Sequence, residues 1–457
     1  MALHIVDGGA NNRGPSMADI LSALSHALDM VEGQPRGHAA RTAYIADRIA
    51  DEIELDEGNR QEILYTSLLK DAGCSDNSAR IHQIFGGDDL LTKNRVKVID
   101  WSSKLESVKF AYANMERGGA VVQKLRRMVA SLSTPDASMD ALTRARCTRG
   151  AGIAKKLGFS DAVAEGVANV DEHWDGRGAP YKLSGERVPL YARIVGLAQT
   201  FEVFVSTFGL QAGLQMLQER NGKWFDPELV RAVFGFSQDT PFWSRHQAHL
   251  GDPNETLPSE IQGCEASATD IDAVCSAFAE IVDAKSDFTG QHSARVCEYS
   301  VELGRYFRFD SERLSILRRA ALLHDLGKLG VSNAVLDKPG RLTEAEFAAV
   351  KLHPQFTDEI LRRIEGFHRI ADVASAHHER LNGSGYWQGF DSEQLDLDMR
   401  VVAVADVFDA LSAERPYREA LPLERVFSIL DQESGTHLDP ECVSAMKTLH
   451  RSSAVAA

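Results

Sequence analysis

The chain has 457 residues, more than one hydrophobic core normally organises, so we expect two domains. Apolar residues make up 44% and charged residues 25%, and no stretch approaches the roughly 18 apolar residues of a membrane helix. We therefore expect a cytoplasmic protein without membrane contact. The net charge of −16 disfavours binding to a nucleic acid polymer, because a phosphate backbone requires a basic surface. The six cysteines are scattered, so structural disulfides are not expected.

The chain contains an internal repeat. His38 matches His292 and Asp71 matches Asp325 at the same spacing along the chain, and the segments between them match without a gap. Matches farther along have a shorter spacing, so the first copy carries extra residues within 78–145. Their basic residues and apolar periodicity predict a helical insertion that packs on the core.

The repeat predicts a division of the chain into five parts. These are a flexible leader at 1–16, a first copy at 17–240, a linker at 241–265, a second copy at 266–450 and a tail at 451–457. The linker is inferred from its content of proline, glycine and polar residues.

The periodicity of both copies predicts helices. Ile271, Val274 and Phe278 recur at three- and four-residue steps, which places them on one helix face. Ser16 followed by Asp19 fits a capping box at a helix start. Because few runs alternate as strands do, the predicted fold class is all-α, with two tandem helical domains joined by a linker.

The second copy carries a set of residues suited to a metal centre. They are His292, His324, Asp325, His353, His377, His378 and Asp406. Any one histidine is more often a hydrogen-bonded core or surface residue than a ligand, so only the whole set favours a metal. Neutral imidazoles with two carboxylates suit Fe, Mn, Zn or Co better than they suit calcium, which prefers a site made only of oxygen ligands. A carboxylate between two imidazole sets can bridge two ions.

The second copy resembles an HD-GYP domain, a branch of the HD phosphohydrolase superfamily. The matching segments span nearly the whole copy: "GQHSARV" (290–296), "LLHDLGKLGV" (322–331), "LDKPGRLTEAEF" (336–347), "KLHP" (351–354), "HHERLNGSGY" (377–386) and "ADVFDALSAERPYR" (405–418). The resemblance implies two tandem HD-type domains and metal ligation by the seven residues above, with Asp325 as the bridging ligand. Phe288 stands where some family members have an acidic residue and hold three metals. The resemblance therefore favours two divalent ions, Fe or Mn.

The resemblance also implies a reaction. It is hydrolysis of a cyclic dinucleotide, cyclic di-GMP in the best-known cases, in bacterial second-messenger signalling. Asp325 and Lys328 would be the catalytic residues, with Lys328 stabilising negative charge on phosphorus. Arg415 and Arg418 match positions that contact substrate phosphate in the family, and surface arginines at a helix end are the alternative. Tyr386 is placed to stack on a guanine.

The two copies depart from the family pattern in opposite ways. In the second copy Asn382 replaces an aspartate and Trp387 a proline of the signature loop, which weakens the argument for cyclic di-GMP. The first copy keeps this loop in "EHWDGRGAPYKLSGERVPLYARI" (172–194) but has lost most metal positions. The replacements are Lys70, Val170, Asp171 and Gln199. We predict that the first copy is a pseudoenzyme domain, serving as a packing partner or as a regulatory domain that binds a nucleotide.

Two alternative functions stay open. The second copy could hydrolyse another nucleotide or phosphate ester, or both copies could form a signalling scaffold with little catalysis. The intact ligand set argues against the scaffold, because drift removes unused ligands, as it did in the first copy. Whether the chain forms a homodimer or binds signalling proteins also stays open.

Overall fold

The computed structural model describes residues 15–75, 88–97, 99, 139–251, 266–286, 290–338, 340–414 and 420–456. Within these ranges all regular structure is helical, and the β-bridges are isolated ones. The predicted all-α class is confirmed.

The first copy is built from ten helices and one short 3-10 turn within the described ranges. They are α1 (Met17–Val31), α2 (His38–Glu52), α3 (Glu57–Leu69), α5 (Asp89–Val96), α8 (Met139–Lys156), α9 (Asp161–Ala168), η2 (Gly185–Arg187), α10 (Leu190–Phe208), α11 (Leu210–Arg220), α12 (Pro227–Gly235) and α13 (Thr240–Gly251).

The second copy repeats this arrangement. Its elements are α14 (Ala268–Asp283), α15 (His292–Tyr306), α16 (Ser311–Leu323), η3 (Leu326–Gly330), α17 (Asn333–Leu336), α18 (Glu344–Val350), α19 (His353–Leu361), α20 (His368–Ser375), α21 (Leu397–Ser412), α22 (Leu423–Glu433) and α23 (Pro440–Ala456).

The first helix of each copy begins in the same way. Ser16 accepts a hydrogen bond from the backbone N–H of Asp19, whose carboxylate binds back to Ser16, so the predicted capping box is confirmed. Ser267 and Asp270 make the same pair at the start of α14. Each reciprocal pair satisfies backbone N–H groups that a helix start leaves without partners.

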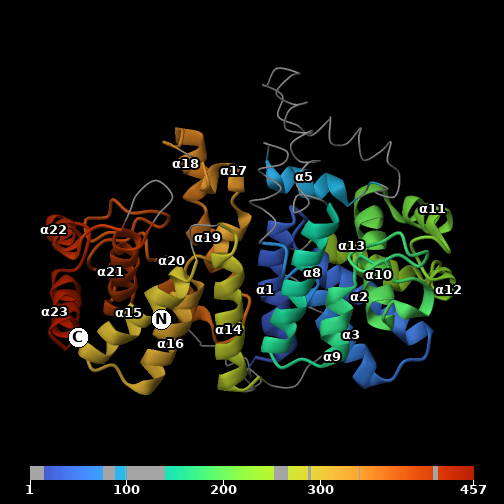
Figure 1. Cartoon of the computed structure of the whole chain (residues 1–457), viewed down its shortest axis with the longest axis horizontal. Coiled ribbons are helices and arrows are strands. Elements are labelled where there is room, and N and C mark those ends of the chain that lie inside the picture. Colours follow the sequence, from blue (N-terminus) through green and yellow to red (C-terminus); the bar gives the residue numbers. More distant parts are fainter. Residues whose placement is uncertain are drawn as a thin grey trace, which may run out of the picture.

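The two copies lie side by side, with α1 and α14 facing each other between them (Figure 1). Helix α1 is apolar and buried nearly all round, as expected of a helix enclosed on all sides. On one side it packs on α2 and α3, and on the other on η3 and α19 of the second copy. One apolar cluster therefore runs through both copies, joining Leu24 and Leu68 to Phe278 and Leu323.

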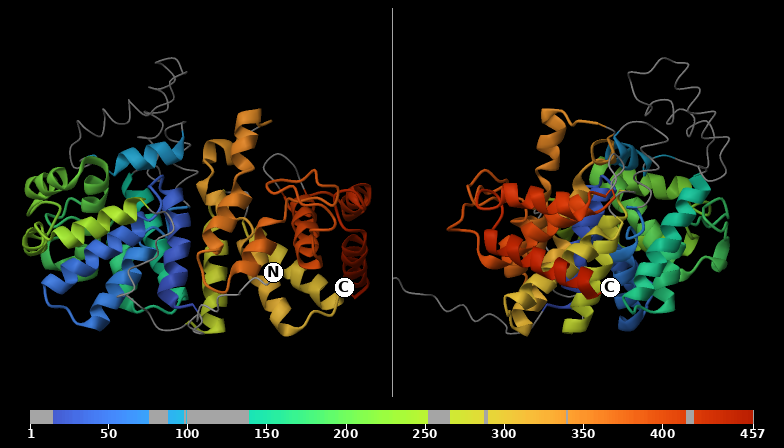
Figure 2. Two further views of the ribbon diagram at one scale, coloured as in Figure 1. Left: turned by 180° about the vertical axis from the view of Figure 1, so that it is seen from behind. Right: turned by 60° about the vertical axis from the view of Figure 1, so that its left-hand side comes forward.

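A second apolar cluster belongs to the first copy alone. It lies between α2, α10, α12 and α13, with Ile45, Phe201, Val233 and Trp243 among its members. Figure 2 shows these helices at the end of the molecule away from the second copy. One apolar cluster of the first copy is thus shared with the second copy, and the other is formed by residues of the first copy alone.

The segment predicted to be a linker begins as a helix. α13 occupies 240–251, and its Phe242 and Trp243 are buried in the first copy, because their large rings complete the second apolar cluster. Residues 252–265 lie outside the described residues. The predicted tail at 451–457 is the last turn and a half of α23, up to Ala456. Of the predicted insertion, α5 and the start of α8 are described and are helical.

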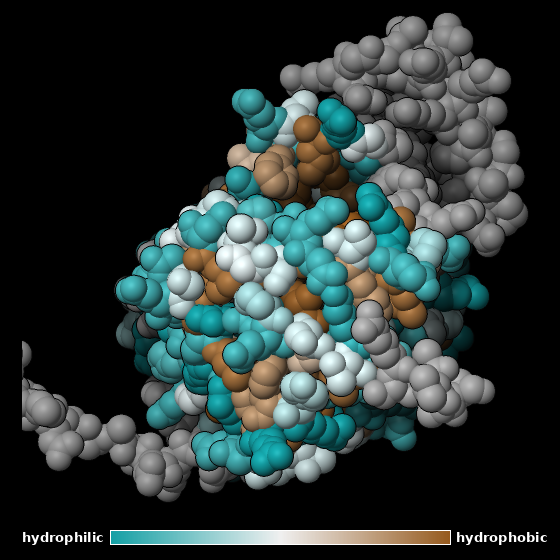
Figure 3. Space-filling model, turned by 90° about the vertical axis from the view of Figure 1, so that its left-hand side faces the viewer, coloured by the Kyte–Doolittle hydropathy of each residue, from teal (hydrophilic) through white to brown (hydrophobic). Residues whose placement is uncertain are grey.

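The surface of the second copy is mixed in character. Figure 3 looks at the end formed by α22 and α23, where hydrophilic side chains surround small, separate apolar areas. Among the described helices, none combines the length and the apolar character that crossing a bilayer requires.

Candidate metal centre

The seven predicted ligands come together in the second copy. Each sits at the end of a helix or on a buried helix face: His292 begins α15, His324 and Asp325 join α16 to η3, His353 begins α19, His377 and His378 follow α20, and Asp406 lies on α21. Their ligand atoms form three overlapping groups, each within 4.8 Å: His353 with His377 and His378, His292 with His324 and Asp406, and His324 with Asp325 and His377.

Asp325 stands between the two sets of histidines. Its Oδ2 lies 3.4 Å from His324 Nε2 and 3.6 Å from His292 Nε2. Its Oδ1 lies 3.5 Å from His353 Nε2 and 3.6 Å from His377 Nε2. Each oxygen of one carboxylate thus faces a different pair of imidazoles, as a ligand that bridges two ions requires.

The histidines are oriented with one ring nitrogen towards the centre. Nδ1 of His324, His353 and His377 each lies 2.7 Å from a backbone carbonyl of the preceding turn and donates its hydrogen there. This fixes the tautomer, so each Nε2 presents a lone pair to the centre. His324 Nε2 and Asp325 Oδ1 are buried without a hydrogen-bond partner among the described residues.

The local electrostatics differ between the two sets of histidines. Burial opposes a charge on His292 and His324, but Asp406 and Asp409 outweigh it and raise the pKa of His292 to about 9, and Asp325 likewise raises the pKa of His324. Burial lowers the pKa of His353 and of His378 to about 3, which keeps both imidazoles neutral. Burial opposes ionisation of Asp325, but Lys328 and His324 outweigh it and hold the pKa of that carboxyl well below its ordinary value. Neutral imidazoles, an ionised carboxylate and buried acceptor atoms without partners fit a divalent transition metal.

One supporting residue was missed in the sequence analysis. Asp409 lies one turn beyond Asp406 on α21, and its Oδ2 accepts a hydrogen bond from His292 Nδ1 at 2.6 Å. Arg295 donates to the same carboxylate, with Nε 2.5 Å from Oδ1. Such a carboxylate orients a ligand histidine and raises its basicity. The internal repeat carried the signal, because Glu202 and Arg41 occupy the matching positions of the first copy.

Two further predicted residues line the centre. Lys328 Nζ lies 2.5 Å from Asp325 Oδ2, so the ammonium reaches the carboxylate that faces both histidine sets. The ring of Tyr386 lies 4.7 Å from the ring of His378, at the edge of the centre. Phe288, Arg415 and Arg418 lie outside the described residues.

The loop after the paired histidines keeps a fixed shape despite its altered sequence. Glu379 accepts hydrogen bonds from the backbone N–H groups of Gln388 at 2.7 Å and Phe390 at 3.1 Å. In the first copy Glu172 accepts the equivalent bonds from Tyr181 and Leu183. Equivalent buried glutamates, Glu172 and Glu379, therefore accept backbone hydrogen bonds that hold the loop together in the two copies.

The matching position of the first copy holds cations. Lys70 forms an ion pair with Asp71, and Arg146 with Asp171. Neither cation offers a lone pair to a metal. His38 is retained, and its Nδ1 is bonded to a buried carboxylate as in the second copy.

One group of the first copy is close enough to hold an ion, namely Glu32, Asp71 and Cys74. Its carboxylates are already neutralised: Lys93 Nζ lies 3.2 Å and Lys97 Nζ 3.4 Å from Glu32. Burial also raises the pKa of Cys74 well above its ordinary value, which disfavours the thiolate that a metal needs.

Comparison with known proteins agrees with this geometry. The sequence profile of the HD domain family matches residues 102–229 and 276–442, one segment in each copy. The chain belongs to the HD domain family, and the resemblance to HD-GYP phosphohydrolases is confirmed.

Relatives match this chain to different extents. Over 439 residues it is 40% identical to the 3′3′-cGAMP-specific phosphodiesterase 3 of Vibrio cholerae, a match that covers 96% of this chain and 95% of that protein. It is 37% identical over 173 residues to a cyclic di-GMP phosphodiesterase response regulator of Xanthomonas campestris, covering 37% of this chain and 46% of that protein.

A solved structure resembles the whole chain. It is a crystal structure of a cyclic GMP-AMP specific phosphodiesterase of V. cholerae, with a TM-score of 0.64 and 36% sequence identity. The match covers 95% of this chain and 97% of that one. The tandem arrangement therefore extends to a relative of similar length.

Proposed function

We propose that this chain is a metal-dependent phosphodiesterase that hydrolyses a guanine-containing cyclic dinucleotide, with the chemistry confined to the second copy. The observation that carries the proposal is Asp325, whose two oxygens face separate pairs of histidine nitrogens. Relatives named for cyclic dinucleotide hydrolysis support the substrate class.

The preferred substrate that we propose is 3′3′-cGAMP. The relative that matches nearly the whole chain is named for that dinucleotide, whereas the cyclic di-GMP enzyme matches only part of it. The sequence analysis favoured cyclic di-GMP, which stays as the alternative. Both dinucleotides carry a guanine, so Tyr386 at the edge of the centre could stack on a base of either.

The proposed centre holds two divalent ions, Fe or Mn. One ion would be held by His292, His324 and Asp406, and the other by His353, His377 and His378, with Asp325 shared. Bound there, two such ions supply Lewis-acid chemistry that activates water and neutralises charge on a phosphodiester.

The residues of the chain would complete the centre. Asp409 orients His292, and the carbonyls of the preceding turns orient the other histidines. Lys328 supplies a positive charge for the phosphorane-like transition state, because its ammonium already lies at the bridging carboxylate. The loop closed by Glu379 would position the base and limit entry of water.

We further propose that the chain consists of a catalytic copy within 266–450 and a pseudoenzyme copy within 17–240. The ion pairs of Lys70 and Arg146 in place of metal ligands support this division. The described part of 241–265, α13, packs as part of the first copy.

The experiment is chromatographic detection of hydrolysis by the full chain, purified without oxygen and loaded with Fe or Mn. The substrates are 3′3′-cGAMP and cyclic di-GMP in parallel, and Asp325→Ala is the inactive variant. Asp71→Ala, its counterpart in the first copy, is the matched control. We expect turnover with a higher kcat/KM for 3′3′-cGAMP, abolished by Asp325→Ala and retained by Asp71→Ala. Absence of turnover of both dinucleotides, with two metals bound, would refute the proposal.

A further inference from the structure

The first copy contains a cavity where the second copy has its metal centre. Its volume is about 480 Å³, within the usual range for small-molecule sites. Asp171 and Gln199 line it, and they match His378 and Asp406 of the second copy. The loop that retains the family sequence, residues 171–182, forms one wall. The residues that replace the metal ligands therefore border a cavity beside the loop that keeps the family sequence.

The cavity is positively charged within an acidic protein. Six cations line it among the described residues: Lys93, Lys97, Arg146, Arg177, Lys182 and Arg193. Four carboxylates face them: Glu32, Asp171, Glu172 and Asp226. The formal excess is two positive charges, whereas the chain as a whole carries −16. A local excess of cations in a walled space concentrates anions there.

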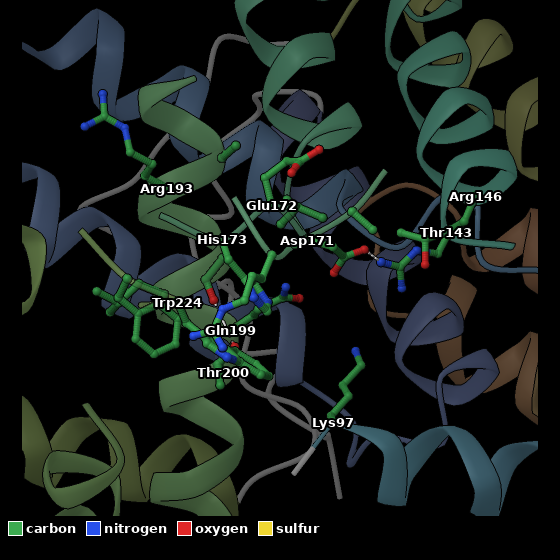
Figure 4. Close-up of a pocket in the computed structure, with 18 of the residues that line it drawn as sticks. Lys97, Thr143, Arg146, Asp171, Glu172, His173, Arg193, Gln199, Thr200 and Trp224 are labelled. Carbon is green, nitrogen blue, oxygen red and sulfur yellow. Dashed lines mark hydrogen bonds and ion pairs between the residues drawn. The ribbon is translucent and has the colours of Figure 1, made fainter. Parts of the chain in front are cut away.

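Several of the cationic groups retain hydrogen-bonding capacity. Lys97 Nζ lies 3.4 Å from Glu32 Oε2 and 3.7 Å from Asp71 Oδ1, and it has no hydrogen-bond partner among the described residues. The same holds for the Nε atom of Arg146, whereas the Arg193 guanidinium pairs with Asp226 and points away from the middle of the cavity (Figure 4). Buried donors of this kind normally find a partner, so an anionic ligand would satisfy them.

Aromatic rings supply a second kind of surface. His173 and Trp224 stack with their centroids 4.1 Å apart and an interplanar angle of 22°, and both line the cavity. Figure 4 shows Trp224 and Gln199 on one side, the pair of Arg146 and Asp171 on another, and Lys97 below the space between them. Arg220 also lies over the Trp224 ring, 3.9 Å from its centroid, so His173 is the ring of this stack on which a base beside the cations would pack.

We propose that this cavity binds an anionic purine nucleotide of about two negative charges and does not cleave it. A cyclic dinucleotide, with two phosphodiesters and two bases, fits both the charge excess and the volume; this choice among nucleotides rests on the proposed function. Cleavage is not expected, because Lys70, Val170, Asp171 and Gln199 stand where the metal ligands would be.

Helix α5 connects the cavity to the catalytic copy. Lys93 lies on it and Lys97 directly follows its last residue, and both line the cavity; Asp89, one turn before Lys93, points to the second copy. Asp89 Oδ1 accepts hydrogen bonds from Ser332 Oγ at 2.6 Å and from the backbone N–H of Asn333 at 2.8 Å. These two residues directly follow η3, which carries Lys328. A ligand that draws Lys93 and Lys97 towards it would therefore bias the segment beside the metal centre.

The binding experiment uses the full chain with Asp325→Ala, which cannot turn over, so it remains valid if hydrolysis fails for other reasons. Calorimetry and tryptophan fluorescence are followed with 3′3′-cGAMP, cyclic di-GMP and inorganic phosphate. Lys97→Gln removes a cavity cation, and Gln199→Glu adds a negative charge at nearly the same shape. Lys155→Gln, an exposed lysine of α8 outside the cavity, is the matched control.

We expect a dinucleotide Kd that rises at least about 10-fold in both cavity variants and stays unchanged in the control. Thermal unfolding checks whether Gln199→Glu is still folded. An unchanged unfolding temperature would show that weaker binding is not caused by misfolding. Equal Kd values in all variants would place the binding in the second copy and overturn the proposal. Failure of every probe to bind, or phosphate binding as tightly as a dinucleotide, would also overturn it.

The connection through α5 has its own test. Asp89→Ala should leave dinucleotide binding to the first copy intact, yet change the dependence of hydrolysis rate on substrate concentration in the same way as Lys97→Gln. Both variants are expected to shift kcat/KM by about 5-fold or more, which is the size of a typical coupling between sites. Rates identical to the unmodified chain at all substrate concentrations would refute the connection.

Discussion

In the second copy Asp409, itself bonded by Arg295, holds His292 in the candidate metal centre, and in the first copy Glu202, bonded by Arg41, holds His38 in the same way. Both copies also close the loop with one buried glutamate. The copies differ inside this shared frame. One frame encloses imidazoles and a bridging carboxylate, and the other encloses ion pairs and a cavity lined by cations.

The comparison shows that the residues that hold the site in place can be retained where the candidate metal ligands are lost. In the first copy the equivalent carboxylate, Glu202, neutralises the buried Arg41, so its loss would leave a buried cation unpaired. Packing therefore keeps this residue even where no metal is bound. A retained frame is consequently weak evidence for retained chemistry, and each prediction below separates the two.

The largest expected difference is between two buried histidines, one in each copy. His353→Ala removes a proposed ligand, so hydrolysis should fall at least about 10³-fold and bound metal from two ions per chain to one. His38→Ala should retain both metals and most activity, because its ring is enclosed by Glu202 in the first copy. Metal analysis of the purified chains together with initial rates makes the measurement. Loss of metal in His38→Ala would contradict the division between the copies.

The supporting carboxylates provide the next test. Asp409→Asn keeps the shape but weakens the hold on His292, so metal affinity should fall about 10- to 100-fold. Glu202→Gln is the matched change in the first copy and should leave metal affinity unaltered. Competition with a chelator measures both. Equal losses in the two variants would show that the first copy also contributes to metal binding.

A smaller effect is expected in the signature loop. Asn382 Oδ1 accepts hydrogen bonds from the backbone N–H of Ser384 at 3.1 Å and from its hydroxyl at 2.7 Å. Asp175, the matching residue of the first copy, accepts the equivalent backbone bond from Arg177 at 3.0 Å. Both side chains form the same turn, so Asn382→Asp should change kcat/KM less than about 3-fold for either dinucleotide. A change above 10-fold would assign this position a role in substrate specificity.

The sequence was sufficient to predict the fold class, the repeat and the convergence of the seven proposed metal ligands. Their types and order carry that information, because six of the seven lie at or next to helix ends and Asp406 lies on a buried helix face. The sequence was insufficient for the cavity of the first copy, since Lys97 and Trp224 are far apart in the chain and only packing brings them together. Buried Phe242 was likewise hidden in a segment whose composition is typical of a linker. The residue content of a segment indicates its local backbone structure. Whether the segment is buried depends on which other parts of the chain pack against it.

The last prediction concerns stability rather than activity, through a buried carboxylate of the first copy. Asp29 on α1 accepts a hydrogen bond from the backbone N–H of Ala39 at 3.0 Å, and burial raises its pKa to about 7. Between pH 4 and 7 the unfolded chain loses this proton while the folded chain keeps it, so stability falls as the pH rises. Above pH 7 the folded chain carries the full cost of a buried charge.

Asp29→Asn removes that cost and can still accept the bond from Ala39. Its free energy of unfolding should exceed that of the unmodified chain at pH 8, by up to about 4 kcal/mol, and the difference should vanish near pH 4. Denaturant unfolding at several pH values measures the difference, with exposed Asp161→Asn as the control. A difference independent of pH would contradict the raised pKa. Helix α1 packs on η3 and α19 of the second copy as well as on its own copy. We therefore expect probes of unfolding in either copy to report the same stabilisation by Asp29→Asn.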